Sequence, residues 1–418
     1  MFSIASFFIV CPPLYADVLD DVIKDFYHSN SDGRFDTLLS RSDIEIDSDN
    51  AIVSNATVAN IKKAILFYQS IVDKGGWPQL PYDKSLQLGS TSILVQKLRE
   101  RLIISHDLDP SKGFSTVFDS YVESAVKYFQ VRHGLPPEGI VTESTIRAMN
   151  VPADVRLRQL RVNLARILAL LKQNMGNRYV IVNIPSATID AVEGDKVVWS
   201  SVAIVGRTDR QTPILHSKIN RIVLNPYWVI PRSIIKNDVM SLMRQDPSYL
   251  TESNIHLINY EGVEVKPEDV DWHASEAPNL IFRQDPGKIN AMASTKIEFY
   301  SQSNAYMHDT PEPALFRNPM RFETSGCVRV SNITNLSVWL LKDTPGWSRN
   351  NIEKVIQTRK TTPIIVNNPI SVHFVYISAW SAKDLVVQFR DDVYGLDNIH
   401  KASVPLSISH SIQPQPAD

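Results

Sequence analysis

The sequence predicts an α+β multidomain protein, in which a helical N-terminal part precedes a mainly β domain with an inserted cap. The 418 residues exceed the length of one ordinary domain, and 43% of them are hydrophobic, which is ample for separate cores. Apolar residues recur at helical spacing up to about residue 177, and runs rich in β-branched residues follow from residue 178. A polar segment at about 233–286 interrupts those runs, and we interpret it as the cap.

The overall composition argues against several classes of function. The net charge of −2 provides no basic field for nucleic acid, so we expect no nucleic-acid partner. No segment approaches the roughly 20 apolar residues that a membrane-spanning helix needs. The ten histidines show no metal-ligand spacing, and no glycine-rich phosphate loop is present. We therefore expect no metal and no cofactor.

Residues 1–16 are predicted to be a signal peptide. Phe2–Val10 forms an apolar core, and Leu14-Tyr15-Ala16 could precede a cleavage site. The alternative is a buried N-terminal segment, because no Lys or Arg precedes the apolar core and Leu14 is not small. Lipidation of Cys11 is not favoured, since Val10 stands where a small residue is expected.

The helical part divides into three predicted pieces. Residues 17–83 form a helical scaffold that ends at Gly75-Gly76-Trp77-Pro78, a strong breaker. Residues 84–150 form a module of three short helices, since apolar residues repeat at helical spacing in three separate runs. Residues 151–177 form a Leu-rich helical linker that returns to the scaffold. The runs within the module include Leu94, Leu98 and Leu102, then Val122, Val126 and Phe129, then Ile146 and Met149.

Residues 178–418 are predicted to form one mainly β domain. Its runs are rich in Val, Ile and aromatic residues and are bounded by glycines and polar clusters. The predicted strands are 179–184, 196–205, 221–224, 296–301, 327–330, 362–366, 372–376 and 385–389.

Cys327 is the most informative residue for function. The chain has two cysteines, and removal of the leader would leave Cys327 as a lone thiol in an exported protein. Retaining such an oxidisable group needs a reason, and nucleophilic catalysis with His308 as the base is one. The alternative is that Cys327 is a small buried hydrophobe.

The residues around Cys327 fit acyl transfer, which needs a base and donors aimed at a developing oxyanion. Gly326 permits a tight backbone, and the amide of Cys327 with a neighbouring amide could supply the donors. If Cys327 begins a strand, Arg329 shares its face. Arg329 could then lower the thiol pKa or hold a substrate carboxylate; the alternative is a structural ion pair.

Two resemblances add to this reading. Gln87-Leu88-Gly89, Val95–Arg99, Ala125–Gln130 and Gly139–Thr142 resemble the peptidoglycan-binding domain 1 family, which implies a wall-binding module over 84–150. The alternative is a helical spacer with no ligand. His308-Asp309-Thr310 and Ser325–Val330 resemble the L,D-transpeptidase (YkuD-type) signature. The further similar segments, 205–213, 225–234, 283–291 and 372–394, place the resemblance in the large Gram-negative, YcbB-like branch.

The second resemblance implies a mechanism and a location. Cys327 would attack the meso-diaminopimelate carbonyl of a donor tetrapeptide stem, release D-alanine and form a thioester. A diaminopimelate amine of an acceptor stem would then form a 3→3 cross-link, with His308 as base and then acid. The implied location is the periplasm of a Gram-negative bacterium. The expected partners are peptidoglycan and other cell-wall enzymes, the expected state is a monomer, and carbapenems would acylate Cys327.

The resemblance also implies roles for residues near the pair. Gly326 and Ser325 would support the active loop, and Arg329, Tyr306, Trp228 and Asp309 would bind substrate. Tyr306 and Trp228 could equally be core aromatics, Ser325 could satisfy local backbone, and Asp309 could tune His308. Two other functions stay open: hydrolysis of the same thioester as an L,D-carboxypeptidase or endopeptidase, and non-catalytic wall binding.

Overall fold

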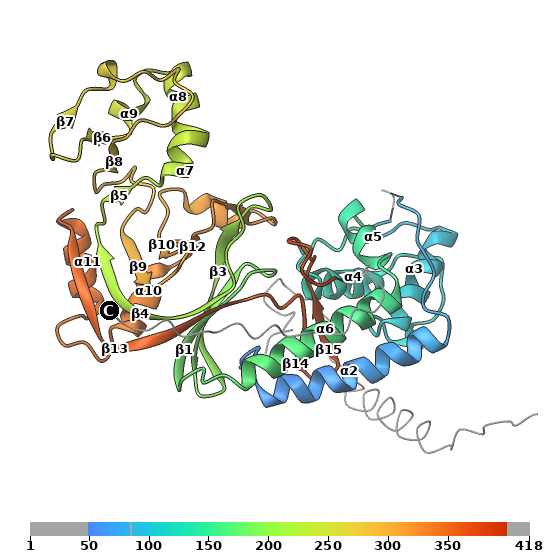
Figure 1. The fold of residues 1–418 in the computed structure, drawn as a ribbon. Coiled ribbons are helices and arrows are strands. Elements are labelled where there is room, and N and C mark those ends of the chain that lie inside the picture. The colour runs from blue at the N-terminus through green and yellow to red at the C-terminus, as the bar shows by residue number, and fades with distance from the viewer. Residues whose placement is uncertain (1–48, 84–85, 399–418) are drawn as a thin grey trace, which may run out of the picture. The chain divides into compact units, whose positions relative to one another are not determined.

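The computed structural model describes residues 49–83 and 86–398 (Figure 1), so the predicted signal peptide over 1–16 lies outside the described residues. The described residues form two compact units. The first holds Lys63–Val131 and Pro137–Asp154, and the second holds the segment up to Lys62, Arg132–Pro136 and the chain from Val155 onward. Two helices, α2 (Asn55–Asp73) and α6 (Ala153–Leu171), contribute residues to both units. The predicted scaffold and linker thus do not form a separate third unit.

The first unit contains the three predicted short helices, α3 (Ile93–Ile104), α4 (Ser120–Arg132) and α5 (Glu143–Met149). Ser92 and Thr142 begin α3 and α5 as N-caps, each accepting a backbone N–H with its hydroxyl. Leu98, Val126 and Phe129 are fully buried in the shared core. The helical periodicity therefore predicted this core, because each helix presents a single apolar face.

The second unit is built on a nine-stranded sheet with the order β11-β3-β12-β10-β9-β4-β13-β1-β2. The sheet closes on itself, because β3 pairs with β2 through Lys196–Val202 and with β12 through Ala203 and Ile204. The strands are β1 (Arg178–Asn183), β2 (Thr188–Glu193), β3 (Lys196–Gly206), β4 (Leu215–Leu224), β9 (Thr295–Phe299), β10 (Met307–His308), β11 (Phe322–Thr324), β12 (Val328–Val330) and β13 (Thr362–Val375).

The core of this unit lies between the sheet and two helices, α10 (Ile333–Leu340) and α11 (Arg349–Gln357). The mainly β fold class is confirmed, but one detail of the prediction is wrong. The stretches 362–366 and 372–376 belong to a single strand, β13, which pairs with β4 on both sides of an irregularity between Ile365 and Ile370. Pro369 lies in this irregularity, and its missing N–H interrupts the ladder without ending the strand.

The predicted cap is a small subdomain with a core of its own. Its sheet is ordered β5-β8-β6-β7, and the three short strands β6, β7 and β8 lie within the predicted segment 233–286, where the sequence predicts none. Strands of two to four residues are too short to produce a recognisable pattern in the sequence. The elements are β5 (Trp228–Val229), α7 (Arg232–Ile234), the π-helical turn Ile235–Val239, α8 (Met240–Gln245), α9 (Tyr249–Glu252), β6 (Ile255–Ile258), β7 (Glu264–Val265) and β8 (Ile281–Gln284).

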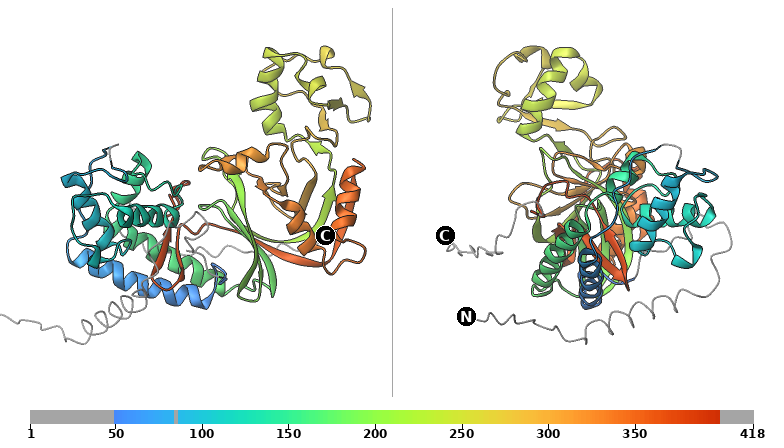
Figure 2. Two further views of the ribbon diagram at one scale, coloured as in Figure 1. Left: turned by 180° about the vertical axis from the view of Figure 1, so that it is seen from behind. Right: turned by 90° about the vertical axis from the view of Figure 1, so that its right-hand side faces the viewer.

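The cap projects from one end of the closed sheet in every view, with β5 and β8 at its base (Figures 1 and 2). After β13 the chain forms a two-stranded sheet of β14 (Ala379–Lys383) and β15 (Val386–Phe389) and continues to residue 398. Within the described part of the chain, no helix is both long and apolar enough to cross a membrane.

Candidate active site

Three adjacent strands bring the predicted base between two cations. In β10, His308 lies opposite Arg329 of β12 on one side and opposite Lys296 of β9 on the other. Residues that alternate with these, Ile297, Met307 and Val328, are fully buried in the core. Because successive side chains point to opposite faces of a strand, Lys296, His308 and Arg329 lie together on the face turned away from that core.

Cys327 directly precedes β12 and lies beside Tyr306. The N–H of Val328 donates to the Tyr306 carbonyl at 3.0 Å, which places the residues before the two strands next to each other. The Cys327 thiol is half-buried, and the neighbouring backbone and hydroxyl of Tyr306 act to lower its pKa. Cys327 and Tyr306 are the residues immediately before β12 and β10, which pair side by side. The predicted nucleophile therefore lies at the start of the strand next to the one that carries the predicted base.

The predicted nucleophile, Cys327, lies in a tight loop at the end of β11. Gly326 has φ of 108°, a left-handed conformation that favours glycine. The hydroxyl of Thr324 donates to the Cys327 carbonyl at 2.5 Å and accepts the Gly326 N–H at 3.3 Å, so one side chain holds both ends of the turn. Ser325 is exposed, and its hydroxyl accepts a hydrogen bond from Arg210 Nη1 at 3.0 Å.

The orientation of His308 comes from the main chain. Its Nδ1–H donates to the backbone carbonyl of Asp309 at 2.6 Å, so the lone pair of this tautomer is on Nε2. The Asp309 carboxylate is engaged elsewhere, since it accepts from the Ser294 hydroxyl at 2.5 Å and from the Thr310 N–H at 2.8 Å. Asp309 thus contacts the base through its carbonyl, which no signal in the sequence indicated.

Burial sets the protonation of the pair. Burial, with a smaller contribution from the Arg329 charge, lowers the pKa of His308 to about 3. Burial also raises the pKa of the Cys327 thiol, and this effect outweighs the opposing contributions of Tyr306, Lys296 and Arg329. Near neutral pH the site therefore holds a neutral thiol and a neutral imidazole. Such a pair needs the base to remove the thiol proton as the thiol attacks its substrate.

Two predicted aromatic residues meet at the site. Trp228 of β5 is near enough to the hydroxyl of Tyr306 to act on its pKa, and it also packs against the core of the cap. The Tyr306 ring lies 5.5 Å from the His308 ring, centroid to centroid. Lys296 Nζ lies 4.4 Å from the Tyr306 ring centroid and 2.8 Å from Glu298. The sequence did not indicate Lys296, because only the pairing of β9 with β10 brings it here.

Arg329 is half-buried, and its Nε is buried without a hydrogen-bond partner in the described structure. No ion pair joins Arg329 to a carboxylate within residues 49–83 and 86–398, so the structural ion pair is not found there. A guanidinium that has no carboxylate partner and lies beside a nucleophile can bind a carboxylate of the substrate. Over the same residues, no group of three or more His, Cys, Asp or Glu side chains is placed to hold a metal.

Comparisons with known proteins find two families whose descriptions match parts of this chain. The family described as L,D-transpeptidase catalytic domain (YkuD) matches residues 177–366, and the one described as "Putative peptidoglycan binding domain" matches residues 92–149. A protein of Haemophilus influenzae named "Putative L,D-transpeptidase" is 34% identical over 222 residues, which cover 52% of this chain and 44% of that protein. The chain thus aligns with less than half the length of this curated relative.

Solved structures with the same description are more distant. An L,D-transpeptidase fragment from Xylanimonas cellulosilytica is 16% identical, with a TM-score of 0.23 over 71% of this chain and 98% of that one. An L,D-transpeptidase from Stackebrandtia nassauensis is 13% identical, with a TM-score of 0.25 over 71% of this chain and 96% of that one.

Proposed function

We propose that this chain forms 3→3 cross-links in peptidoglycan through a thioester on Cys327, because residues 177–366 match the family described as L,D-transpeptidase catalytic domain. One observation carries the proposal: Cys327 directly precedes β12, which pairs with the strand that carries His308, and the imidazole of His308 is oriented by the Asp309 carbonyl. Acyl transfer needs such a nucleophile and base. The peptidoglycan binding domain at residues 92–149 supports peptidoglycan as the substrate.

In the first half of the reaction, His308 Nε2 takes the Cys327 proton as Sγ attacks the carbonyl of the third residue of a donor tetrapeptide. The bond between that carbonyl and D-alanine breaks, and His308 returns the proton to the leaving amine. The product is a thioester on Cys327 and free D-alanine. Backbone N–H groups of the Gly326–Cys327 turn are the proposed donors to the oxyanion.

In the second half, the side-chain amine of diaminopimelate on an acceptor stem attacks the thioester carbonyl. His308 removes a proton from that amine, the C–S bond breaks, and the proton passes to the leaving Cys327 sulfur. Arg329, unpaired in the described structure, is the proposed partner of a stem carboxylate. Tyr306 and Trp228 form the proposed wall towards the cap, while Asp309 acts on His308 through its carbonyl.

The proposed location is the periplasm of a Gram-negative bacterium, reached through the predicted leader over 1–16. Fusion of residues 1–20 to a reporter enzyme that is active only after export tests this directly. Acylation of Cys327 by a carbapenem is a further proposal from the same chemistry, since a β-lactam carbonyl meets the same thiol and base. An intact thiol after prolonged exposure of folded protein would count against it.

Intact mass of the purified protein, incubated with a disaccharide-tetrapeptide donor, tests the function. We expect a thioester adduct and free D-alanine from the wild type, and neither from Cys327→Ala. His308→Ala should form the adduct about 10²-fold to 10⁴-fold more slowly. His273→Ala, an exposed residue of the cap, is the matched control and should behave as the wild type.

The same experiment separates the alternatives. Repeating it with an acceptor stem should give a cross-linked dimer; release of tripeptide at the same rate with or without acceptor would instead indicate an L,D-carboxypeptidase. Folded protein with a titratable thiol, no adduct and no D-alanine would favour a wall-binding protein without catalysis.

A further inference from the structure

The segment that follows β15 reaches the active-site region although it lies beyond residues 177–366. The hydroxyl of Tyr394 donates to the Gly206 carbonyl at 2.6 Å and accepts the Thr212 N–H at 3.2 Å. Tyr394 is 9% exposed, and burial raises the pKa of its hydroxyl, so the hydroxyl stays protonated and can act as both donor and acceptor. One buried hydroxyl therefore joins the first and last residues of the loop Gly206–Thr212.

This loop is internally tight. The Gly206 N–H donates to the Thr212 hydroxyl at 2.8 Å, so its ends are joined a second time. A Cβ on Gly206 would lie 2.3 Å from the Arg210 carbonyl oxygen, a distance that no side chain could tolerate without a backbone shift. The loop consequently has little freedom to change shape. A shift of its two ends therefore also shifts the residues between them.

The tip of the loop contacts the turn that carries the nucleophile. The Arg207 N–H donates to the Thr324 carbonyl at 3.0 Å, and Arg210 donates to the Ser325 hydroxyl. The Gln211 carbonyl oxygen lies 3.3 Å from where a Cβ on Gly326 would stand, so it closes off the space beside that glycine. Thr324, Ser325 and Gly326, the three residues before Cys327, therefore all lie against the loop Gly206–Thr212, whose two ends are bonded to Tyr394.

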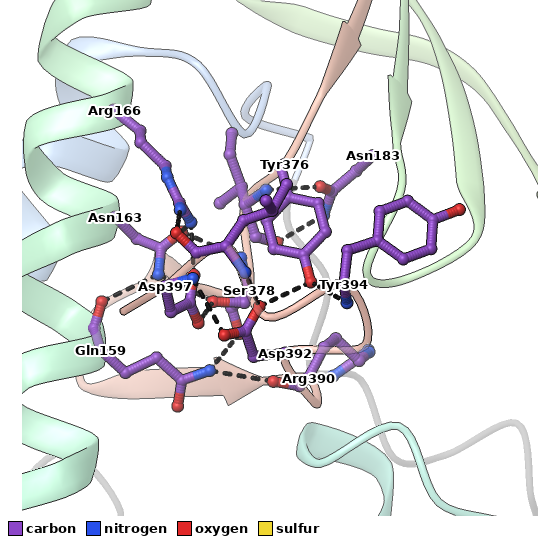
Figure 3. Close-up of polar contacts among 12 residues, drawn as sticks. Gln159, Asn163, Arg166, Asn183, Tyr376, Ser378, Arg390, Asp392, Tyr394 and Asp397 are labelled. Atoms are coloured by element: carbon purple, nitrogen blue, oxygen red, sulfur yellow. Dashed lines mark hydrogen bonds and ion pairs between the residues drawn. The ribbon is translucent and has the colours of Figure 1, made fainter. Parts of the chain in front are cut away.

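Tyr394 is itself fixed by a buried network (Figure 3). Its backbone N–H donates to the hydroxyl of Tyr376 at 2.9 Å, and that hydroxyl donates to Asp392 at 2.7 Å. The rings of Tyr376 and Tyr394 stack with their centroids 5.7 Å apart. Asp392 also accepts the backbone N–H groups of Leu396 at 2.8 Å and Asp397 at 2.9 Å, which folds the segment back on itself.

The network continues to the helix α6. Asp397 accepts from the Ser378 hydroxyl at 2.5 Å and pairs with Arg166 of α6 at 2.5 Å, while Asn163 of α6 accepts the Ser378 N–H at 2.9 Å (Figure 3). Tyr394 therefore connects a rigid, fully bonded support to the nucleophile turn. Placement of a nucleophile matters greatly, since an error of about 1 Å can cost about 10²-fold in rate.

We propose that Tyr394 is a positioning residue for Cys327, acting through the loop Gly206–Thr212. The inference rests on the proposed function, because the rate it affects is the acylation of Cys327. It adds a residue from outside the matched catalytic domain to the machinery of that reaction.

The test compares Tyr394→Phe with Tyr179→Phe. Both variants keep a buried ring, but Tyr179, which is 3% exposed, lies in β1 and contacts His373 rather than the loop. We measure the maximal rate and half-saturating donor concentration of thioester formation. Hydrogen–deuterium exchange is followed in peptides that cover residues 206–212 and 324–328, and thermal unfolding is recorded for each variant.

For Tyr394→Phe we expect the maximal rate to fall at least about tenfold, with half-saturation within twofold of the wild type. Exchange in both peptides should be at least threefold faster, and Tyr179→Phe should change neither. A maximal rate within twofold of the wild type, whatever the melting temperature, overturns the proposal, as does a loss of rate without faster exchange.

A wild type that forms no thioester would contradict the proposed function and leave the positioning role testable. In that case the rate at which iodoacetamide alkylates Cys327 is measured in place of the rate of acylation. A change of threefold or more in that rate, together with faster exchange in both peptides, supports the role; unchanged alkylation overturns it.

Discussion

His308 is oriented by the backbone carbonyl of Asp309, its immediate neighbour in the chain, at a distance of 2.6 Å from Nδ1. A carbonyl fixes the tautomer as a carboxylate would, but it brings no full negative charge to stabilise an imidazolium. Burial and the nearby Arg329 therefore dominate, and the imidazole stays neutral well into the acid range. A side-chain substitution at Asp309 leaves this carbonyl in place, so its consequences are tested through pH and through His308 itself.

The low pKa of His308 predicts acid sensitivity of the fold. An ordinary histidine has a pKa of 6.5 and the buried one has a pKa of about 3, so the unfolded chain binds a proton that the folded protein excludes. The contribution of neutral His308 to the free energy of unfolding is fully present above about pH 6.5. It is lost as the pH falls towards 3, with a slope of up to about 1.4 kcal/mol per pH unit.

Urea unfolding of the wild type and His308→Gln at several values between pH 7 and pH 4 measures this slope. We expect the wild type to lose stability more steeply than the variant. His273→Gln should keep the steep slope of the wild type, because His273 is exposed in the cap. Parallel curves for the wild type and His308→Gln would contradict the predicted shift.

Removal of the Tyr306 hydroxyl should make the Cys327 thiol less acidic. Burial already raises the pKa of this thiol, and the neighbouring Tyr306, through its backbone and its hydroxyl, opposes that rise. Tyr306→Phe should therefore lower the rate of alkylation by iodoacetamide at pH 7 by about threefold to tenfold, since one pKa unit corresponds to about a tenfold change in thiolate. Tyr300→Phe, at an exposed position nearby, is the control. Equal alkylation rates for Tyr306→Phe and the wild type would refute this contribution.

Gly326 and Gly346 form a matched pair for testing the nucleophile turn. Both have positive φ, 108° and 85°, but a Cβ at Gly326 would lie 3.3 Å from the Gln211 carbonyl, whereas a Cβ at Gly346 would meet open space. Either substitution by Ala should cost about 1 kcal/mol of stability for its backbone conformation. Only Gly326→Ala should also lower acylation, by about 10²-fold, because it displaces the turn before Cys327. Comparable activity in the two variants, measured by intact mass, would show that this turn tolerates crowding.

Much of the architecture could be predicted because it depends on local patterns. Apolar residues at helical spacing indicated α3, α4 and α5, because each of these helices buries one face. Runs of β-branched residues indicated β1 and β3, because these strands are largely buried. Short elements left no such pattern, so β6 to β8 of the cap were missed. The long strand β13 was predicted as two strands, because its pattern is interrupted around Pro369. In each case the partner strand, rather than the segment itself, supplies the stability.

The sequence by itself determined which residues are the candidates for the chemistry. The sequence shows Cys327 as a lone thiol and His308 as a base 19 residues before it, each within a recognisable motif. The chemical nature of these side chains does not depend on the fold. The tertiary structure decided what surrounds them. Lys296 lies beside His308 and Tyr394 supports the loop on which Gly326 rests only because strand pairing and a buried network join segments far apart in sequence. Burial lowers the pKa of His308 and raises that of Cys327. These shifts depend on the tertiary structure, because every segment that covers a group contributes to its desolvation.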